Sequence, residues 1–273
     1  MRGNSTELPP EPGAGPELRA HVRMTGATHV YSAIGREPVQ VGPFALEVRH
    51  REFFSVVGPH GCGKSTLLKM AAGLLPTVAG KIEISGDEVK SVVTDVGILF
   101  SDPTLLGWRT VMGNVMLQAE LRSLDLRQCA ERARLLIAAM GLSGLEDRRG
   151  HELAQGMAQR VAICRALLHS PGLLLADDPF QFLDPLAREQ IAMDLQRLWL
   201  REPITILYAT SHIEEAVQLS HRISVISPDG SGIVETICID LPHPRRMDKA
   251  TTPQIVDYSN RIRTIFHALG VFP

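Results

Sequence analysis

A phosphate-loop pattern, G-x-x-x-x-G-K-[ST], constrains this chain more than any other feature of its sequence. Its residues are Gly58, Pro59, His60, Gly61, Cys62, Gly63, Lys64 and Ser65, followed by Thr66. The apolar run Phe53–Val57 before the loop predicts a buried strand, and Ser65–Ala72 after it predicts a helix. A chance glycine-rich turn is the alternative, but few such turns carry Gly-Lys-Ser between a strand and a helix. The pattern therefore predicts nucleotide binding.

The chemistry of the loop suits a triphosphate with its metal. Glycines let backbone N–H groups curl around an oxyanion, and a helix N-terminus adds partial positive charge. Lys64 is expected to reach the terminal phosphates, and the Ser65 hydroxyl to bind Mg²⁺. Cys62 has two interpretations: a thiol whose oxidation or alkylation blocks nucleotide, or a tolerated small residue, which we favour.

Composition excludes several other classes of protein. The net charge of −2 and the isoelectric point near 6.6 give no electrostatic case for nucleic acid binding. The four cysteines lack CxxC spacing, which favours reduced thiols over disulfides or zinc. The sequence shows neither an N-terminal apolar signal nor an apolar run long enough to cross a bilayer. We expect a cytoplasmic protein without direct membrane insertion, reaching the membrane only through a partner.

Periodicity predicts an α/β fold with a mainly parallel sheet. Residues 1–19 are rich in Pro, Gly and Glu and are expected to be a disordered tail. Helical spacing recurs within residues 101–168 and predicts a helical insertion, and residues 251–273 predict a C-terminal helix. The expected strands are His21–Met24, Phe44–Val48, Phe53–Val57, Lys81–Ser85, Val96–Phe100, Leu173–Ala176, Ile204–Thr210, Arg222–Ile226 and Ile233–Ile237. The expected helices of the insertion are Leu117–Leu124, Cys129–Met140 and Met157–Leu168, and another helix starts at Asp184-Pro185.

Two adjacent carboxylates follow the apolar strand Leu173–Ala176. Asp177 is placed to hold Mg²⁺ through water, opposite Ser65, and Asp178 to orient or deprotonate an attacking water. Helix caps are the alternative interpretation of such acids. Tyr31 fits either a platform on which adenine stacks or a turn aromatic that packs on the sheet.

Taken together, the motifs resemble those of the ATP-binding-cassette (ABC) transport ATPases, and the similarity runs from about Val22 to Leu269. More narrowly, the chain looks like the ATPase subunits of nitrate, sulfonate and taurine importers. Besides the phosphate loop, four segments in family order resemble the glutamine loop, the signature, the second nucleotide motif with the dimer loop, and the switch region. These are Ser101–Val111, Leu153–Val161, Asp177–Asp184 and Thr210–Ala216. Tyr31 falls where the family keeps its adenine-stacking aromatic, which favours the platform.

The resemblance implies a P-loop NTPase cassette over residues 20–250, with an N-terminal antiparallel β subdomain and a helical subdomain over about 101–168. Two such subunits, identical or different, close head to tail on two MgATP. Each ATP lies between the phosphate loop of one subunit and the signature of the other, here Leu153, Ala154, Gln155 and Gly156. Membrane-spanning permease subunits dock around Ser101–Val111. The chain would therefore lie on the cytoplasmic face of the membrane, held through the permease.

Departures from the family pattern cluster on the hydrolytic steps. Ser101 replaces the glutamine, Asp178 the longer catalytic glutamate, and Ala154 and Gln155 the signature serine and glycine. At the switch, Ser211 takes the histidine position and His212 comes one residue later, which on an extended segment turns its side chain to the opposite face.

Positions that bind ground-state MgATP are intact, whereas the altered ones mainly serve the transition state. We therefore expect ATP to bind and to be hydrolysed slowly. A regulatory or scaffold protein that binds ATP without pumping is the alternative. The negative net charge disfavours a third interpretation, a relative that acts on DNA or ribosomes.

Overall fold

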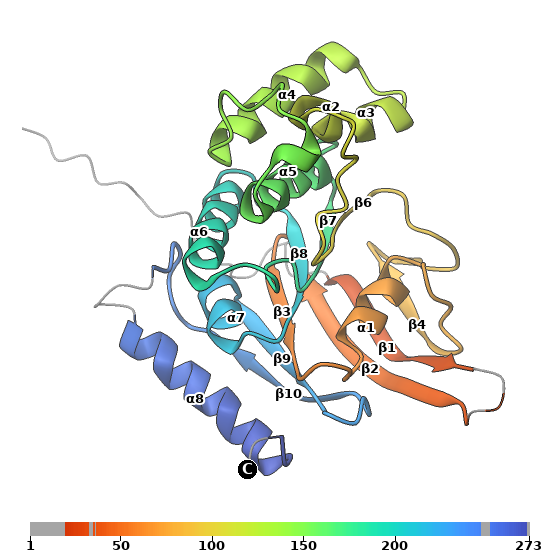
Figure 1. Cartoon of the computed structure of the whole chain (residues 1–273). Helices are drawn as coiled ribbons and strands as arrows, with labels where there is room; N and C mark the ends of the chain where they lie inside the picture. The colour runs from red at the N-terminus through yellow and green to blue at the C-terminus, as the bar shows by residue number, and fades with distance from the viewer. Residues whose placement is uncertain (1–19, 33–34, 36, 247–251, 272–273) are drawn as a thin grey trace, which may run out of the picture.

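The computed structural model describes residues 20–32, 35, 37–246 and 252–271. The tail expected over residues 1–19 lies outside the described residues. A six-stranded sheet in the order β10-β9-β3-β8-β7-β6 runs through the centre of the molecule (Figure 1). Its strands are β3 (Phe53–Val57), β6 (Val96–Leu99), β7 (Leu173–Asp177), β8 (Thr205–Thr210), β9 (Arg222–Ile226) and β10 (Ile233–Cys238). Every neighbouring pair is parallel except β9 and β10, which confirms the mainly parallel sheet.

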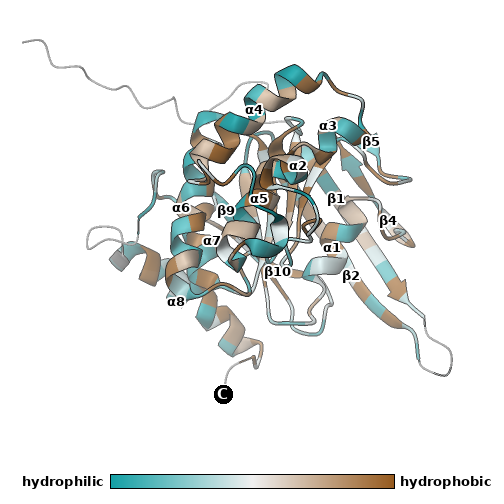
Figure 2. Ribbon diagram, turned by 45° about the horizontal axis from the view of Figure 1, so that its top comes forward, coloured by the Kyte–Doolittle hydropathy of each residue, from teal (hydrophilic) through white to brown (hydrophobic). Residues whose placement is uncertain are grey.

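A second sheet is antiparallel and has the order β2-β1-β4-β5. Its strands are β1 (Ala20–Tyr31), β2 (Val39–Arg49), β4 (Ala79–Ile84) and β5 (Asp87–Glu88). Buried and exposed residues alternate along β2 from Pro43 to Arg49, and Figure 2 shows the matching alternation of hydropathy on this strand. One face of the sheet is therefore apolar and covers the core, as the resemblance implies.

The first strand is three times as long as its predicted core, because a bulge hides its continuation. The pairing of β1 with β2 shifts register between Met24 and Ala27, which breaks the period-two pattern. Gly26 and Gly80 make this possible: both have positive φ, and a Cβ on Gly80 would lie 2.2 Å from the Gly26 carbonyl oxygen. As a result β1 runs on to Tyr31, so Tyr31 ends a strand rather than occupying a turn.

Eight α-helices and a 3₁₀ turn are described. They are α1 (Lys64–Ala71), α2 (Val111–Val115), α3 (Leu117–Leu121), α4 (Leu126–Ala139), η2 (Gly150–Glu152), α5 (Gln155–Leu167), α6 (Pro185–Arg201), α7 (Ile213–Leu219) and α8 (Thr252–Ala268). The Asp184 side chain caps α6 by accepting from the Ala187 N–H at 3.0 Å, as predicted. The short helix α2 was not predicted, because it spans little more than one turn and contains Gly113.

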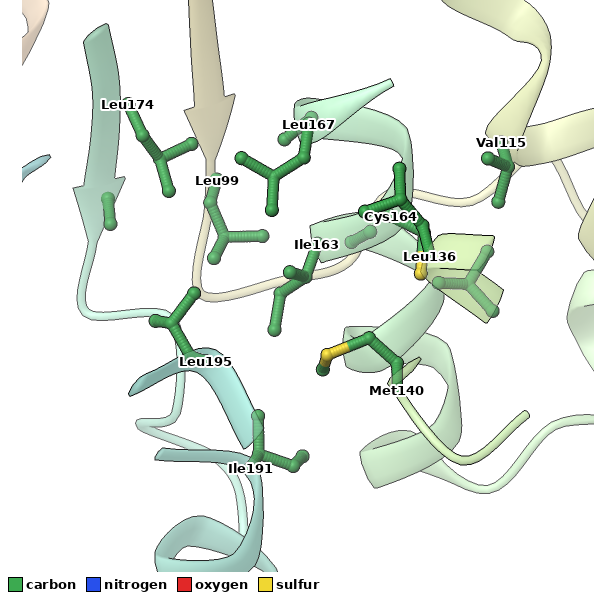
Figure 3. Packing of buried hydrophobic residues seen from close by; sticks show 14 of the residues in the cluster. Leu99, Val115, Leu136, Met140, Ile163, Cys164, Leu167, Leu174, Ile191 and Leu195 are labelled. Carbon is green, nitrogen blue, oxygen red and sulfur yellow. The ribbon is translucent and has the colours of Figure 1, made fainter. Parts of the chain in front are cut away.

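Alternate residues of the central sheet face two different layers. Phe53 packs with α5 and α6 on one face, whereas Phe54 packs with α1 and the antiparallel sheet on the other. In Figure 3, Ile163, Cys164 and Leu167 of α5 lie among strand residues Leu99 and Leu174, Leu136 of α4, and Met140 directly after α4. Helix α5 is thus the link between the helical elements and the sheet.

The C-terminal helix α8 packs its apolar side on α7 and on the β9–β10 edge. Ile255, Ile262 and Phe266 are buried there. Arg261 and Arg263 lie on the exposed side, where they pair with Glu235 and Glu214, in line with the predicted solvated face. In the part of the chain that the structure describes, no helix has the length and apolar character to span a membrane.

Candidate nucleotide-binding site

The carboxyl ends of three neighbouring strands, β3, β8 and β7, form the site. Strand β3 pairs in parallel with β8, and β8 with β7, so their ends meet at one edge of the sheet. The phosphate loop follows β3, the two acids lie at the end of β7, and the switch segment follows β8. This edge is where parallel α/β sheets bind their ligands, so residues far apart in the sequence meet there.

The phosphate loop turns into α1 through Gly63, whose φ of 99° is in the left-handed region. A Cβ at this position would lie 2.4 Å from Cγ1 of Val41, so only glycine fits without displacing β2. The Gly63 carbonyl accepts from the Leu67 N–H at 2.9 Å and starts the helix. The first backbone N–H groups of a helix have no intrahelical acceptor, which makes this turn suited to an anion.

Lys64 is buried and curls back over the loop. Its Nζ donates to the carbonyl oxygens of Gly58 at 2.6 Å and Pro59 at 2.8 Å. Neither carbonyl carries a net negative charge, so the ammonium keeps its charge for an anionic ligand. This is the arrangement expected of a lysine that binds phosphate.

Cys62 packs in the apolar layer beneath the loop, and its Sγ lies 3.9 Å from Nζ of Lys64. Its side chain is fully buried, and burial raises the pKa of its thiol despite the nearby Lys64 charge. Thiolate is the reactive form of cysteine. The structure therefore favours the interpretation of Cys62 as a small buried residue over that of a reactive thiol.

Ser65 and Asp177 form the predicted metal pair. The Ser65 hydroxyl donates to Oδ1 of Asp177 across 2.8 Å, joining the start of α1 to the end of β7. Burial raises the pKa of the Asp177 carboxyl, and the neighbouring Asp178 charge adds to this, so a cation would be favoured beside it. Mg²⁺ is typically bound by one or two protein oxygens together with phosphate and water. The Ser65 hydroxyl and the Asp177 carboxylate are suitable oxygen ligands of this kind.

Asp178 is buried, and both its carboxylate oxygens accept hydrogen bonds from the residues that follow β8. Thr210 Oγ1 donates to Oδ1 at 3.3 Å, and Ser211 Oγ donates to Oδ2 at 3.1 Å. The Asp178 N–H donates to the Ala209 carbonyl at 2.7 Å, and its φ of 43° is in the left-handed region. The carboxylate is thus turned toward the switch segment and held there.

The switch segment bends at Ser211, while His212 itself has an extended φ of −94° and ψ of 105°. Strand β8 ends at Thr210, and the His212 N–H donates to Thr210 Oγ1 at 3.1 Å in a tight turn that starts α7. The expectation that the His212 side chain turns to the face opposite Ser211 stays a prediction, although the two side chains contact different groups, Arg188 and Asp178. Nδ1 of His212 contacts Nη1 of Arg188 at 3.0 Å. Burial and the Arg188 charge lower the pKa of His212, while the Asp178 and Glu214 charges oppose this.

Sequence reasoning missed a buried polar group behind this segment, formed by Arg188, Tyr208 and Glu215. The Tyr208 hydroxyl donates to Oε1 of Glu215 at 2.6 Å, and Arg188 Nε lies 3.8 Å from Oε2. Burial raises the pKa of Glu215 to about 7. The sequence feature that could have revealed this group is Glu215, which lies among the apolar residues Ile213, Ala216 and Val217 of α7.

Tyr31 lies beside the first turn of α1. Its hydroxyl and that of Thr66 are 3.0 Å apart in a hydrogen bond, and its ring meets His29 edge-on with centroids 4.5 Å apart. The side chain remains 43% exposed, so part of the ring faces solvent next to the phosphate loop. A base could stack there, as predicted for adenine.

Two predicted segments lie outside this cluster of contacts. Ala154 precedes α5 without a side-chain cap, and a Cβ on Gly156 would lie 3.9 Å from Ala187, so the Leu153–Gly156 segment packs on α6. Gln155, the first residue of α5, is exposed. Ser101 follows β6 and is half-buried; the carbonyl of Phe100 before it accepts from Gln159 Nε2 at 2.9 Å.

Comparison with known proteins agrees with this geometry. The family described as ABC transporter matches residues 41–181, slightly more than half of the chain. An uncharacterized ABC transporter ATP-binding protein of Methanocaldococcus jannaschii is 36% identical over 248 residues, covering 91% of this chain and 92% of that protein. The aliphatic sulfonates import ATP-binding protein of Bacillus licheniformis is 39% identical over 200 residues, covering 73% and 77%. The taurine import ATP-binding protein of Escherichia coli O157:H7 is 35% identical over 214 residues, covering 78% and 84%.

Solved structures have the same fold. The dimeric structure of the bacterial ABC transporter cassette MJ0796 gives a TM-score of 0.71 at 25% identity, covering 81% of this chain and all of that one. The cbiO1 protein of Clostridium perfringens, part of the transporter complex cbiONQ, gives 0.72 at 21% identity, covering 92% and 99%. The two-sheet α/β architecture agrees with these matches. The chain is therefore a member of the ABC transporter family of ATP-binding proteins.

Proposed function

We propose that this chain is the ATP-binding subunit of an ABC importer for a small sulfonate-like or nitrate-like anion. The observation that carries the proposal is the Ser65–Asp177 hydrogen bond of 2.8 Å beside a phosphate loop whose Lys64 donates to the Gly58 and Pro59 carbonyls. The solute class rests on the relatives, which are named as importers of aliphatic sulfonates and of taurine.

ATP and Mg²⁺ would be held by residues from three elements. Backbone N–H groups of the loop from Gly58 to Thr66 and the Lys64 ammonium would bind the phosphates, and Tyr31 would stack on the adenine. Ser65 and Asp177 would hold Mg²⁺, which supplies charge neutralisation at the phosphates when bound. Each of these groups would contact MgATP before hydrolysis, so the chain would bind MgATP.

A second subunit would complete the site. Ala154 and Gln155 of the Leu153–Gly156 segment are exposed, so they are available to a nucleotide held by another chain. Met157, next in the chain, is 43% exposed, and near the start of α6 Phe182 is 56% and Leu186 66% exposed. Exposed apolar side chains such as these can be covered by a partner protein. The relative MJ0796, solved as a dimer, gives the same expectation for this chain as a homodimer or heterodimer.

Permease subunits would dock on the Ser101–Val111 segment. Arg165 of α5 donates to the carbonyls of Pro103 at 2.7 Å and Thr104 at 3.0 Å. His151 Nδ1 contacts the Gly107 carbonyl at 2.8 Å, and next to it Trp108 is 73% exposed. An exposed tryptophan on a segment that is fixed to α5 suits a helix from a membrane-spanning partner. The chain would therefore work at the cytoplasmic face of the membrane.

Hydrolysis would be slow. Asp178 already accepts two hydroxyl donors, which compete with an attacking water for the same oxygens. Ser101 is shorter than a glutamine, and Ala154 brings no hydroxyl to the signature. Misplacement of a reacting group by about 1 Å can cost about 100-fold in rate. The subunit would act mainly as an ATP-dependent clamp whose turnover depends on its partner.

The engaged carboxylate of Asp178 also favours a second function, that of an ATP-binding regulatory or scaffold subunit. Co-purification separates the two. Expressed in its own cells with an affinity tag, an importer subunit brings down membrane-spanning proteins from detergent extracts, and Trp108→Ala weakens this. ATP-dependent recovery with soluble proteins alone would support the regulatory function and contradict the importer.

A further inference from the structure

We propose that Arg188 is a positioning residue that holds His212 in the tautomer with its proton on Nε2, so that the displaced histidine can serve as the hydrogen-bond donor to the terminal phosphate of ATP. This inference rests on the proposed function for its ligand. Its structural part, the tautomer and the cause of that tautomer, stands apart from the function and can be measured without ATP.

The contact between the two side chains has one chemical interpretation. A guanidinium has only N–H donors, so at 3.0 Å the Nδ1 of His212 must accept from Nη1 of Arg188. A neutral imidazole carries a single proton, which is then on Nε2. A second proton on the ring would face the fixed positive charge of Arg188, and two cations in contact are unfavourable. Nε2–H is left as the only donor of the ring.

Arg188 itself is fixed by other contacts, which makes it a rigid support. It lies one turn after the Asp184 cap of α6. Its guanidinium donates to the carbonyls of Phe180 at 3.3 Å, Leu183 at 3.2 Å and Gln181 at 3.4 Å. Its Nε lies 3.8 Å from the buried Glu215 carboxylate, which balances its charge. The imidazole is thus tied to the helix and to the loop that follows the two acids.

The charged and titratable groups around His212 come from every side of the site. They are Arg188 on α6, Asp178 after β7, Glu214 on α7 and His60 in the phosphate loop, and each influences the charge of the ring. His60 Nε2 also contacts Gln181 Nε2 at 3.0 Å, which joins the phosphate loop to the segment that Arg188 holds. The groups that influence the ring thus include one in the phosphate loop and the carboxylate after β7, while Ser211 is turned to Asp178.

Histidine tautomers can be read directly by NMR on nitrogen-15 histidine-labelled full-length protein at about pH 7. We expect His212, assigned with His212→Gln, to show one pyrrole-like Nε2 and one pyridine-like Nδ1. In Arg188→Met, its signals should move toward the averaged values of a ring that exchanges between tautomers. His221 is the internal reference, because its Nδ1 accepts from the Phe53 N–H at 3.1 Å without Arg188. A proton on Nδ1 of His212 in the native protein would overturn the proposal. It would also be overturned if the signals of both His212 and His221 were the same in Arg188→Met as in the native protein.

Single-turnover kinetics test the functional part. We expect His212→Ala to lower the rate of the chemical step by about 100-fold, the usual effect of losing one phosphate or oxyanion donor. Arg188→Met should lower it by a similar factor with little change in ATP affinity. The double variant should be no slower than either single variant, because Arg188 acts through His212.

Controls keep this result interpretable. Arg197→Met removes a guanidinium from the same helix, where it is 54% exposed and pairs with Asp194, and should leave the rate unchanged. Arg188→Lys retains the positive charge but replaces the planar guanidinium by a single ammonium group. It should therefore recover less than half of the rate loss seen in Arg188→Met, measured on a logarithmic scale. Multiplicative losses in the double variant would contradict the proposal. Absence of ATP binding in the native chain would instead refute the proposed function, leaving the tautomer result as it stands.

Discussion

The Ser211 hydroxyl donates to Oδ2 of Asp178 across 3.1 Å, so the residue at the family's histidine position binds the residue at its glutamate position. Two of the substitutions are therefore coupled in space, although they lie 33 residues apart. Ser211 and Thr210 satisfy a buried carboxylate that would otherwise lack partners. This network stabilises the site without nucleotide.

Asp178→Glu alone should raise turnover by less than about tenfold, which corresponds to about 1.4 kcal/mol. The longer side chain loses the hydroxyl bonds of Thr210 and Ser211, and glutamate tolerates the φ of 43° less well than aspartate. Steady-state phosphate release measures the effect, with Asp184→Glu at the cap of α6 as the control. Recovery of an ordinary transporter rate of about 1 s⁻¹ would mean that Ser101, Ser211 and the signature contribute little.

Lys64→Ala should weaken ATP binding by about 10- to 100-fold, because a charge-assisted hydrogen bond contributes about 1.5–3 kcal/mol. Titration with a fluorescent ATP analogue and Mg²⁺ gives the affinity. Lys81→Ala is the matched control, since that lysine lies on β4 and pairs with Glu83. Equal affinity in Lys64→Ala and Lys81→Ala would exclude the phosphate loop as the nucleotide site.

Ile163→Ala should destabilise the protein by about 2–5 kcal/mol, because it leaves a cavity where α5 meets the sheet. Urea unfolding of the purified chain measures the loss. Leu135→Ala, at a position that is 72% exposed, should change the free energy of unfolding by less than about 0.5 kcal/mol. Similar losses in both variants would show that α5 does not carry the contact between the helical elements and the sheet.

Two half-buried histidines, His221 and His243, should make the protein less stable in acid. Burial and the Arg245 charge lower the pKa of His221 to about 4 and that of His243 to about 3. Between those values and the ordinary pKa near 6.5, the unfolded chain binds more protons than the folded one, so the free energy of unfolding falls as the pH drops through this window. The variant His221→Gln/His243→Gln should lose most of this slope in urea unfolding at several pH values.

The pH slope needs two references. The exposed His151→Gln should keep the native slope. Glu215 acts in the opposite direction, because its pKa is raised to about 7 and its protonation stabilises the fold as the pH falls from about 7 toward 4.5. Glu215→Gln should therefore steepen the acid loss of stability. An unchanged slope in the double histidine variant would contradict this assignment.

Local pattern was enough to predict several elements and parts of the site. The apolar runs Phe53–Val57 and Arg222–Ile226 were predicted with the bounds that β3 and β9 have, because turn residues flank both. The phosphate loop and the position of Ser65 opposite Asp177 were also predicted from the sequence, because both residues lie close after a strand that could be recognised.

Other features depend on tertiary contacts that no local pattern contains. The length of β1 was missed because the bulge at Gly26 interrupts its alternation. The bend at Ser211 was not predicted, because it accompanies a bond from the His212 N–H to the Thr210 side chain. Arg188 was not identified, because its contact with His212 spans 24 residues and depends on how α6 packs against α7.

Binding and turnover of ATP by the same preparation of the purified subunit test the central claim most directly. The account predicts saturable MgATP binding at micromolar concentrations together with single-subunit turnover well below about 1 s⁻¹. Turnover at or above that rate, or failure to bind MgATP at all, would contradict it.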